Sequence, residues 1–199
     1  ADIQDVSKAI GLDGRIGRKF LHVGPGYGGS CFPKDTLALA QTARDAGAPT
    51  SIVESVIQSN DDRKKEMARK VIKALNMKQG ESKTVAVLGL TFKPNTDDMR
   101  DAPSLTIVPA LQKEGIKIQA YDPVGRDEAE KHLHNVQWAS SSYEAMKGVD
   151  AVVILTEWNE FRALDFRKMA QTMGYPLLID MRNIYRPEEM IAAGFDYVS

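Results

Sequence analysis

The chain has 199 residues, of which 43% are hydrophobic and 27% charged, and its formal net charge is −1. It can therefore bury a core, which excludes a disordered chain, and the balanced charge predicts no nucleic-acid partner. Its apolar runs, such as 151–155, are far too short to span a membrane, and it does not start like a signal peptide, so no membrane partner is expected.

The first 77 residues are predicted to be mostly helical. A helix over 2–10 is followed by a loop over 13–30 that contains six glycines. Apolar residues at helical spacing predict a second helix over 35–46. Residues 1–77 are therefore expected to form a central helical region that carries the glycine-rich loop.

One long helix is predicted over 51–76. Apolar residues recur at helical spacing near both of its ends. We interpret its charged middle, 61–66, as a solvated face. A polar linker over 78–83 follows.

Apolar strands alternate with helices beyond the linker, which is typical of a parallel sheet covered on both faces. Residues 84–199 are thus expected to form a Rossmann-like, doubly wound domain, so that the fold class is α/β. The predicted strands are 84–90, 117–121, 135–139, 151–156, 176–180 and 195–198, and the predicted helices are 104–114, 143–147 and 164–172.

Such sheets bind ligands beyond the C-terminal ends of their strands. The first strand runs into Gly89-Leu-Thr-Phe-Lys93, which is not the G-x-G-x-x-G fingerprint of a dinucleotide site. Asp122 follows the second strand, where a ribose-binding acid often lies. Without the fingerprint, a nucleotide bound as substrate is favoured over a dinucleotide bound by this domain.

The chain has one cysteine, so it cannot form an internal disulfide, which fits the reducing cytoplasm. A lone cysteine is usually a small buried hydrophobic residue, and its surroundings decide whether it does chemistry. The histidines form no cluster with metal-ligand spacing, so no metal is expected.

The most informative segment is 24–35, GPGYGGSCFPKD, where a glycine-rich loop runs into a helix and Cys31 lies at or just before the helix N-terminus. Unpaired backbone N–H groups and the helix dipole stabilise a thiolate there, and Lys34 adds positive charge. Asp35, one turn later, can organise a water molecule or a proton. The ordinary alternative is a helix start capped by Ser30, which requires neither the cysteine nor so many glycines.

This segment resembles the nucleophile motif of nucleotide-sugar dehydrogenases, G-[FY]-G-G-S-C-x-x-K-D, in the UDP-glucose/GDP-mannose dehydrogenase family. Three further stretches are similar to the family, and the first of them to its UDP-glucose members in particular. Four motifs in the right order argue against coincidence. The further stretches are 14–21, then 89–93 continued by 95–100 and 102–104, and finally 179–183.

The resemblance implies an NAD-dependent four-electron oxidation of UDP-glucose to UDP-glucuronate, a product used in polysaccharide biosynthesis. In the family, the sugar C6 alcohol is oxidised to an aldehyde, which the thiolate, here Cys31, captures as a thiohemiacetal. A second oxidation gives a thioester that water hydrolyses, and covalent capture keeps the aldehyde bound. Asp35 matches the family aspartate that assists with water and protons.

The resemblance also assigns contacts with ligands to nine further residues. Substrate contacts are implied for Phe20, His22, Gly28, Phe92, Lys93 and Arg182, NAD contacts for Lys34 and Arg100, and a contact with the substrate of a neighbouring subunit for Arg15. Cations that follow predicted strands suit a pyrophosphate, although most such side chains are surface cations. The helix over 51–76 is then expected to form the core of a homodimer.

The chain departs from the family in lacking its dinucleotide-binding half, so we expect the C-terminal part of a longer enzyme that does not turn over alone. Position 22 is His where relatives often have Lys, which puts that uridine contact in question. The alternatives are a dehydrogenase of GDP-mannose or a UDP-N-acetylhexosamine, or a non-catalytic nucleotide-sugar binding fragment. The Cys31 motif and the Arg15 segment favour UDP-glucose, and an independent thiol hydrolase would need a histidine partner near the motif.

Overall fold

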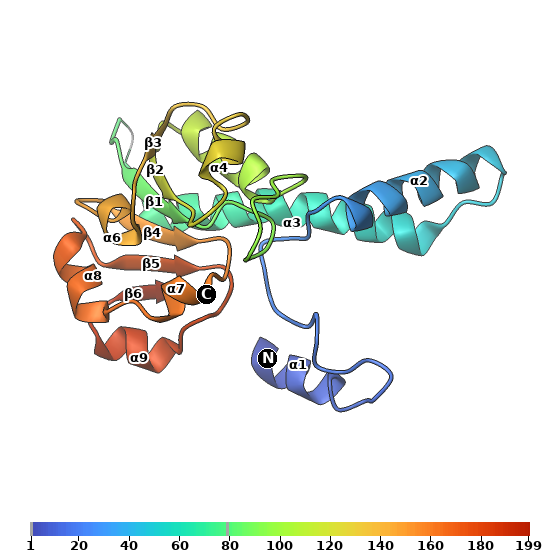
Figure 1. The fold of residues 1–199 in the computed structure, drawn as a ribbon, viewed down its shortest axis with the longest axis horizontal. Helices are drawn as coiled ribbons and strands as arrows, with labels where there is room; N and C mark the ends of the chain where they lie inside the picture. The colour runs from blue at the N-terminus through green and yellow to red at the C-terminus, as the bar shows by residue number, and fades with distance from the viewer. Residues whose placement is uncertain (1, 79) are drawn as a thin grey trace.

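The computed structural model describes residues 2–78 and 80–199, so Ala1 of the predicted helical region and Gln79 of the predicted linker lie outside the described residues. Helices α1 (Ile3–Ile10), α2 (Cys31–Asp45) and α3 (Ser51–Leu75) precede the sheet. Figure 1 shows that α3 passes along the sheet with its C-terminal half, while its N-terminal half projects away with α2 beside it. We call residues 2–59 the N-terminal arm and residues 84–199 the sheet domain.

The sheet domain holds six parallel strands in the order β3-β2-β1-β4-β5-β6. This order confirms the predicted Rossmann-like, doubly wound α/β fold, and the chain changes direction across the sheet between β1 and β4. The strands are β1 (Thr84–Leu88), β2 (Lys117–Tyr121), β3 (Val136–Trp138), β4 (Ala151–Ile154), β5 (Leu177–Asp180) and β6 (Asp196–Val198).

Two hydrophobic cores cover the two faces of the sheet, because successive strand residues point to opposite faces. Val85 and Val87 pack against α3 and α4, and Ala86 and Leu88 pack against the helices of the other face. The helices of the domain are α4 (Ser104–Lys113), α5 (Arg126–Ala129), α6 (Ser142–Ala145), α7 (Asn159–Arg162), α8 (Phe166–Thr172) and α9 (Pro187–Ala192).

Most elements lie where the sequence predicts them, and the differences concern helix starts and very short helices. Helix α2 begins at Cys31, four residues before the expected start, because Pro33 is tolerated in a first helical turn. Helices α5, α7 and α9 were not predicted, since four to six residues are too few to display a helical period.

The interpretation of 61–66 as a solvated face is wrong at one position. Lys64 is buried, while its neighbours in this segment are exposed. The buried positions of α3 are 60, 64, 67, 68, 71 and 75, so the stripe of the C-terminal half continues through a polar stretch. The core of the sheet domain therefore extends into α3 on the far side of the predicted linker.

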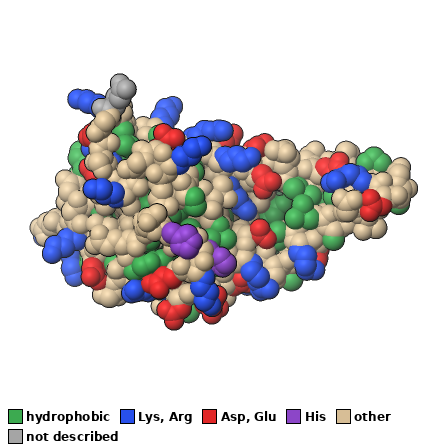
Figure 2. Space-filling view, turned by 90° about the horizontal axis from the view of Figure 1, so that it is seen from above, with side chains coloured by type: hydrophobic (Ala, Val, Ile, Leu, Met, Phe, Trp, Pro, Cys, Tyr) green, Lys and Arg blue, Asp and Glu red, His purple; other side chains and the backbone are tan. Residues whose placement is uncertain are grey.

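Charges are spread over the surface. On the face that Figure 2 shows, basic and acidic side chains are interspersed, with hydrophobic side chains among them on the narrow projecting part. Within residues 2–78 and 80–199, no helix is long and apolar enough to cross a membrane.

Candidate functional site

Cys31 is the first residue of α2, and its thiol is free and exposed. The Ser30 hydroxyl lies 3.7 Å from the Cys31 sulfur and makes no capping hydrogen bond to the helix. The expectation that an ordinary helix start would be capped by Ser30 is thus not met. The N-terminal N–H groups of α2 remain available to a negative charge at the thiol.

Two cations lie near the thiol. The ion pair with Asp35 raises the pKa of Lys34. Hydrogen bonds to Asp98 raise the pKa of Arg100. The negative charge of a Cys31 thiolate raises both pKa values by a smaller amount. Both side chains are largely exposed, so their carboxylate partners hold them weakly. Asp35 lies beside Lys34 and is itself exposed.

The glycines of the loop before Cys31 are required by close packing within the chain. A Cβ atom at Gly24 would lie 2.1 Å from the Arg182 guanidinium, and one at Gly28 would lie 2.5 Å from the Asp101 carbonyl oxygen. Gly29, with φ +85°, lies against the ring of Phe92 in the same way. Protein atoms therefore occupy the space that a side chain at these three positions would need.

The loop therefore touches several predicted site residues in turn. Arg182 lies at its Gly24 end, and Phe92 lies at Gly28 and Gly29. The Lys93 ammonium sits 5.2 Å from the centre of the Phe92 ring and is exposed. These contacts place the predicted substrate residues of the sheet domain along the loop that ends at the thiol.

Arg182 follows β5 and pairs with Glu157, which follows the neighbouring strand β4, at an N–O distance of 2.5 Å. The Arg182 side chain is only 12% exposed. Arg182 Nε and Glu157 Oε2 are buried and have no hydrogen-bond partner within the described residues. A buried guanidinium with a free N–H is suited to one more acceptor, such as a phosphate oxygen.

A cavity of about 1000 Å³ opens between the start of α1, α3 and the segment 183–188, and Val23, which precedes Gly24 of the glycine loop, lines it, whereas Arg182 and Glu157 do not. Its volume suits a nucleotide-sized ligand. Arg63 and Lys70 of α3 line it, and Arg63 also donates a hydrogen bond to the Gly24 carbonyl. The sequence analysis predicted no binding role for these two cations. They are seven residues apart, about two helical turns, so they lie on the same face of α3, and this spacing could have indicated a shared site.

Arg15, Phe20 and His22 lie apart from this group. Arg15 pairs with Asp13, Phe20 is 96% exposed, and His22 is exposed. Among the described residues, no hydrogen bond joins these three side chains to the sheet domain. The structure thus gathers Gly28, Cys31, Lys34, Arg100, Phe92, Lys93 and Arg182 along one loop and leaves these three outside.

Asp122 ends β2 as expected, but its carboxylate is used inside the fold. It is buried and accepts hydrogen bonds from the backbone N–H groups of Leu90, Thr91 and Gly125 and from the indole of Trp158. A carboxylate with so many internal donors has little capacity left for a ribose. Among residues 2–78 and 80–199, no three acidic, histidine or cysteine side chains are arranged to hold a metal ion.

Two family models match the chain. The "UDP-glucose/GDP-mannose dehydrogenase family, UDP binding domain" matches residues 86–187, and the central domain of the same family matches residues 1–62. The first match covers nearly all of the sheet domain, and the second covers the arm with the thiol.

Whole-chain relatives agree with these matches. The chain is 57% identical over 199 residues to a UDP-glucose 6-dehydrogenase of Rhizobium meliloti, which covers 100% of this chain and 45% of that protein. It is 44% identical to the UDP-glucose 6-dehydrogenase TuaD of Bacillus subtilis, covering 43% of it. A solved UDP-glucose dehydrogenase from Pyrobaculum islandicum superposes with a TM-score of 0.84 at 30% identity, over 98% of this chain and 42% of that one. The chain thus spans less than half the length of these relatives.

Proposed function

Because the chain belongs to the UDP-glucose/GDP-mannose dehydrogenase family, we propose that it is the C-terminal part of an NAD-dependent UDP-glucose 6-dehydrogenase. One observation carries this proposal: the exposed thiol of Cys31 begins α2 with Lys34 and Arg100 nearby. A thiol at a helix N-terminus beside cations is suited to nucleophilic catalysis. The relatives at 57% and 44% identity are both named for UDP-glucose.

In the proposed reaction, Cys31 acts between two oxidations. NAD, held in part by Lys34 and Arg100, would supply the hydride acceptor for both oxidations. The Cys31 sulfur adds to the aldehyde carbon, and the aldehyde oxygen takes up a proton to give the thiohemiacetal. After its oxidation to the thioester, water adds to the carbonyl carbon, the C–S bond breaks and the thiolate leaves. Asp35 accepts one proton of that water, the new carboxyl group loses the other to solvent as it ionises, and UDP-glucuronate is released.

The described residues fit part of an NAD site. Lys34 and Arg100 are exposed cations whose ion pairs with Asp35 and Asp98 are weak, so an anionic or amide group of the dinucleotide can replace those partners. The turn after β1 is not the glycine fingerprint that cradles a dinucleotide phosphate. We propose that the remaining contacts with NAD come from the half of the enzyme that the relatives possess beyond this chain.

UDP-glucose is proposed to bind along the glycine loop and the adjacent cavity. Arg182 would hold the pyrophosphate through its unpaired N–H, with Lys93 adding charge and Phe92 and Gly28 bounding the site. Phe20 and His22 would join them when substrate orders their loop. The exposure of Phe20 supports this idea, because a large apolar ring in water needs a partner.

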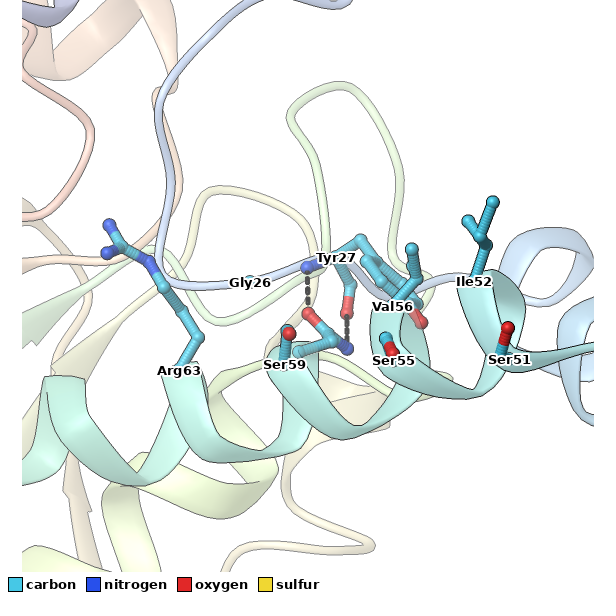
Figure 3. Close-up of a pocket in the computed structure, with 9 residues that line it drawn as sticks. Gly26, Tyr27, Ser51, Ile52, Ser55, Val56, Ser59 and Arg63 are labelled. Carbon is cyan, nitrogen blue, oxygen red and sulfur yellow. Dashed lines mark hydrogen bonds between the residues drawn. The ribbon is translucent and has the colours of Figure 1, made fainter.

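A homodimer is proposed around the N-terminal half of α3. Ile52 and Val56 are exposed there and, together with Ser51, Ser55 and Ser59, help to line a hollow of about 550 Å³ (Figure 3). In such a dimer Arg15 would reach the substrate site of the partner subunit. The free, exposed Cys31 thiol supports a reducing compartment, so we propose that the enzyme works in the cytoplasm.

The test uses the full-length enzyme and its Cys31→Ser variant. We expect two NADH and one UDP-glucuronate for each UDP-glucose consumed, and a fall in kcat of about a thousandfold or more in the variant. GDP-mannose and UDP-N-acetylglucosamine at equal concentration should give much lower kcat/KM. Normal turnover by Cys31→Ser, or a preference for GDP-mannose, would overturn the proposal.

A further inference from the structure

The carboxamide of Asn60, in the middle of α3, holds one residue of the glycine loop through both of its polar atoms. Its Oδ1 accepts the Tyr27 N–H at 2.8 Å, and its Nδ2 donates to the Tyr27 carbonyl at 3.2 Å. These are the two dashed bonds that reach Tyr27 in Figure 3. Two bonds in opposite directions to one residue set both the distance and the orientation of the backbone, which a single bond would leave free.

Lys64, one helical turn further along α3, holds a second loop. Its ammonium donates to the Asp101 carbonyl at 3.1 Å. Burial lowers the pKa of Lys64, so this bond comes at a desolvation cost that a surface lysine would avoid. The adjacent Arg100 carbonyl accepts the Gly29 N–H at 2.7 Å. One face of α3 therefore fixes two loops, and the two loops are bonded to each other.

The packing leaves these loops little freedom. A Cβ atom at Gly26 would lie 2.8 Å from Asn60 Oδ1 and 3.0 Å from the Lys64 side chain. The loop backbone thus rests directly on the two side chains. Any change in the size or polarity of Asn60 must move the loop, because nothing compressible lies between them.

Tyr27 lies close to the thiol, so a shift of the Tyr27 backbone would also move Cys31. Cys31 is four residues further along the chain. The ring of Tyr27 packs edge-on against the ring of Phe32, the residue after Cys31, with centroids 4.6 Å apart. On the other side, the Gly29 bond links the same loop to Arg100, a cation near the thiol.

We infer that Asn60 is a positioning residue of the active site, which sets the placement of Cys31 relative to Arg100 through Tyr27, with Lys64 fixing the Arg100 side. This inference rests on the proposed role of Cys31 as nucleophile. A carboxamide is required at position 60 because it carries one acceptor and two donors on a short side chain. Asp lacks the donor for the Tyr27 carbonyl, and Leu lacks both groups.

The experiment compares the full-length enzyme with Asn60→Leu and Asn60→Asp. Gln58→Leu is the matched control, because Gln58 is an exposed carboxamide on the same helix, bonded only to Asp62. We measure kcat, KM for UDP-glucose, and hydrogen exchange at the Tyr27 amide. Asn60→Leu is expected to lower kcat about a hundredfold, since small displacements of a reacting group are costly, with KM changed less than about threefold.

Asn60→Asp keeps the acceptor for the Tyr27 N–H and is expected to recover part of the lost kcat, which a merely structural role would not predict. If Asn60→Leu fails to fold, the kcat and Tyr27 exchange of Asn60→Asp test the inference in its place. Tyr27 amide exchange should speed up at least about tenfold in Asn60→Leu and remain near wild type in Gln58→Leu.

Unchanged exchange at Tyr27, or equal losses of kcat in Asn60→Leu and Gln58→Leu, would overturn the inference. The two proposals fail separately. If Cys31→Ser turns over normally while Tyr27 exchange still rises in Asn60→Leu, the nucleophile assignment is wrong and Asn60 positions a loop of another purpose.

Discussion

The N-terminal arm and the sheet domain differ in how they bury their apolar residues. Of the fourteen large hydrophobic side chains that are exposed among the described residues, eleven lie in 2–59 and three lie in 84–199. Conversely, Ala40 is the one buried hydrophobic residue of the described chain that precedes Met67. The sheet domain closes its own cores, whereas the arm presents apolar faces that need another surface.

This difference fits the length of the relatives, less than half of which the chain spans. The arm carries the thiol and the sheet domain carries Arg182, and the glycine loop packs between them, with Gly24 against Arg182 and Gly28 against Asp101. The comparison teaches that the sheet domain buries its apolar residues within itself, while the arm, which carries the Cys31 thiol, exposes apolar side chains that another surface could cover.

The sharpest test of the comparison uses one substitution at two places on α3. Val71→Ala, at a side chain with no exposure, should lower the free energy of unfolding by about 2–3 kcal/mol through lost burial and a cavity. Val56→Ala, at a side chain 39% exposed, should change it by less than about 0.5 kcal/mol. Urea unfolding of this chain measures both, and equal effects would mean that the arm has its own core.

A second test asks whether the glycine loop truly joins the two regions. Gly28→Ala should lower the free energy of unfolding by about 1–3 kcal/mol, because the new Cβ atom would lie 2.5 Å from the Asp101 carbonyl oxygen. Gly14→Ala is the control, since a Cβ there meets nothing within 4 Å. Thermal unfolding reports both variants, and a neutral Gly28→Ala would show that the loop does not pack against the 98–101 segment in solution.

The smallest expected effect concerns the ion pair beside the thiol. Hydrogen bonds from Arg100 lower the pKa of Asp98, so the pair stabilises the fold above the unfolded carboxyl's pKa of about 3.9 and loses this as pH falls through the lowered value. Because Arg100 is exposed, Asp98→Asn should cost at most about 1 kcal/mol at pH 7. The free energies of unfolding of the wild type and Asp98→Asn should approach each other as the pH is lowered from 7 to 3. A difference that stays constant with pH would contradict this account.

Much of the fold was predictable because its strands are short apolar runs separated by clear helical or turn segments. Strand β2 and helix α3 begin at their predicted residues. The burial of Asn60 and Lys64 was not anticipated, because a polar sequence was taken to mean a solvated surface. Their spacing from Met67 and Val71 held the correct signal, since burial follows the helical period even where the residues are polar.

The site was predictable as a list of residues and less so as an arrangement. The position of Cys31 at a helix start follows from the local pattern of glycines and Pro33. The pairing of Arg182 with Glu157 joins residues from two strands, and the internal use of Asp122 depends on backbone groups of a neighbouring turn. Such contacts depend on strand order, which composition and periodicity leave open.

The central claim is that this chain holds the nucleotide site of a UDP-sugar dehydrogenase, and calorimetry of UDP binding to the chain tests it most directly. Arg182→Ala is compared with Arg167→Ala, an exposed arginine of α8 that does not line the cavity. We predict that UDP binds more tightly than GDP and that Arg182→Ala alone weakens UDP at least about tenfold, by removing a buried charged donor. Equal binding of UDP and GDP, no binding of UDP, or equal effects of the two substitutions would contradict the account.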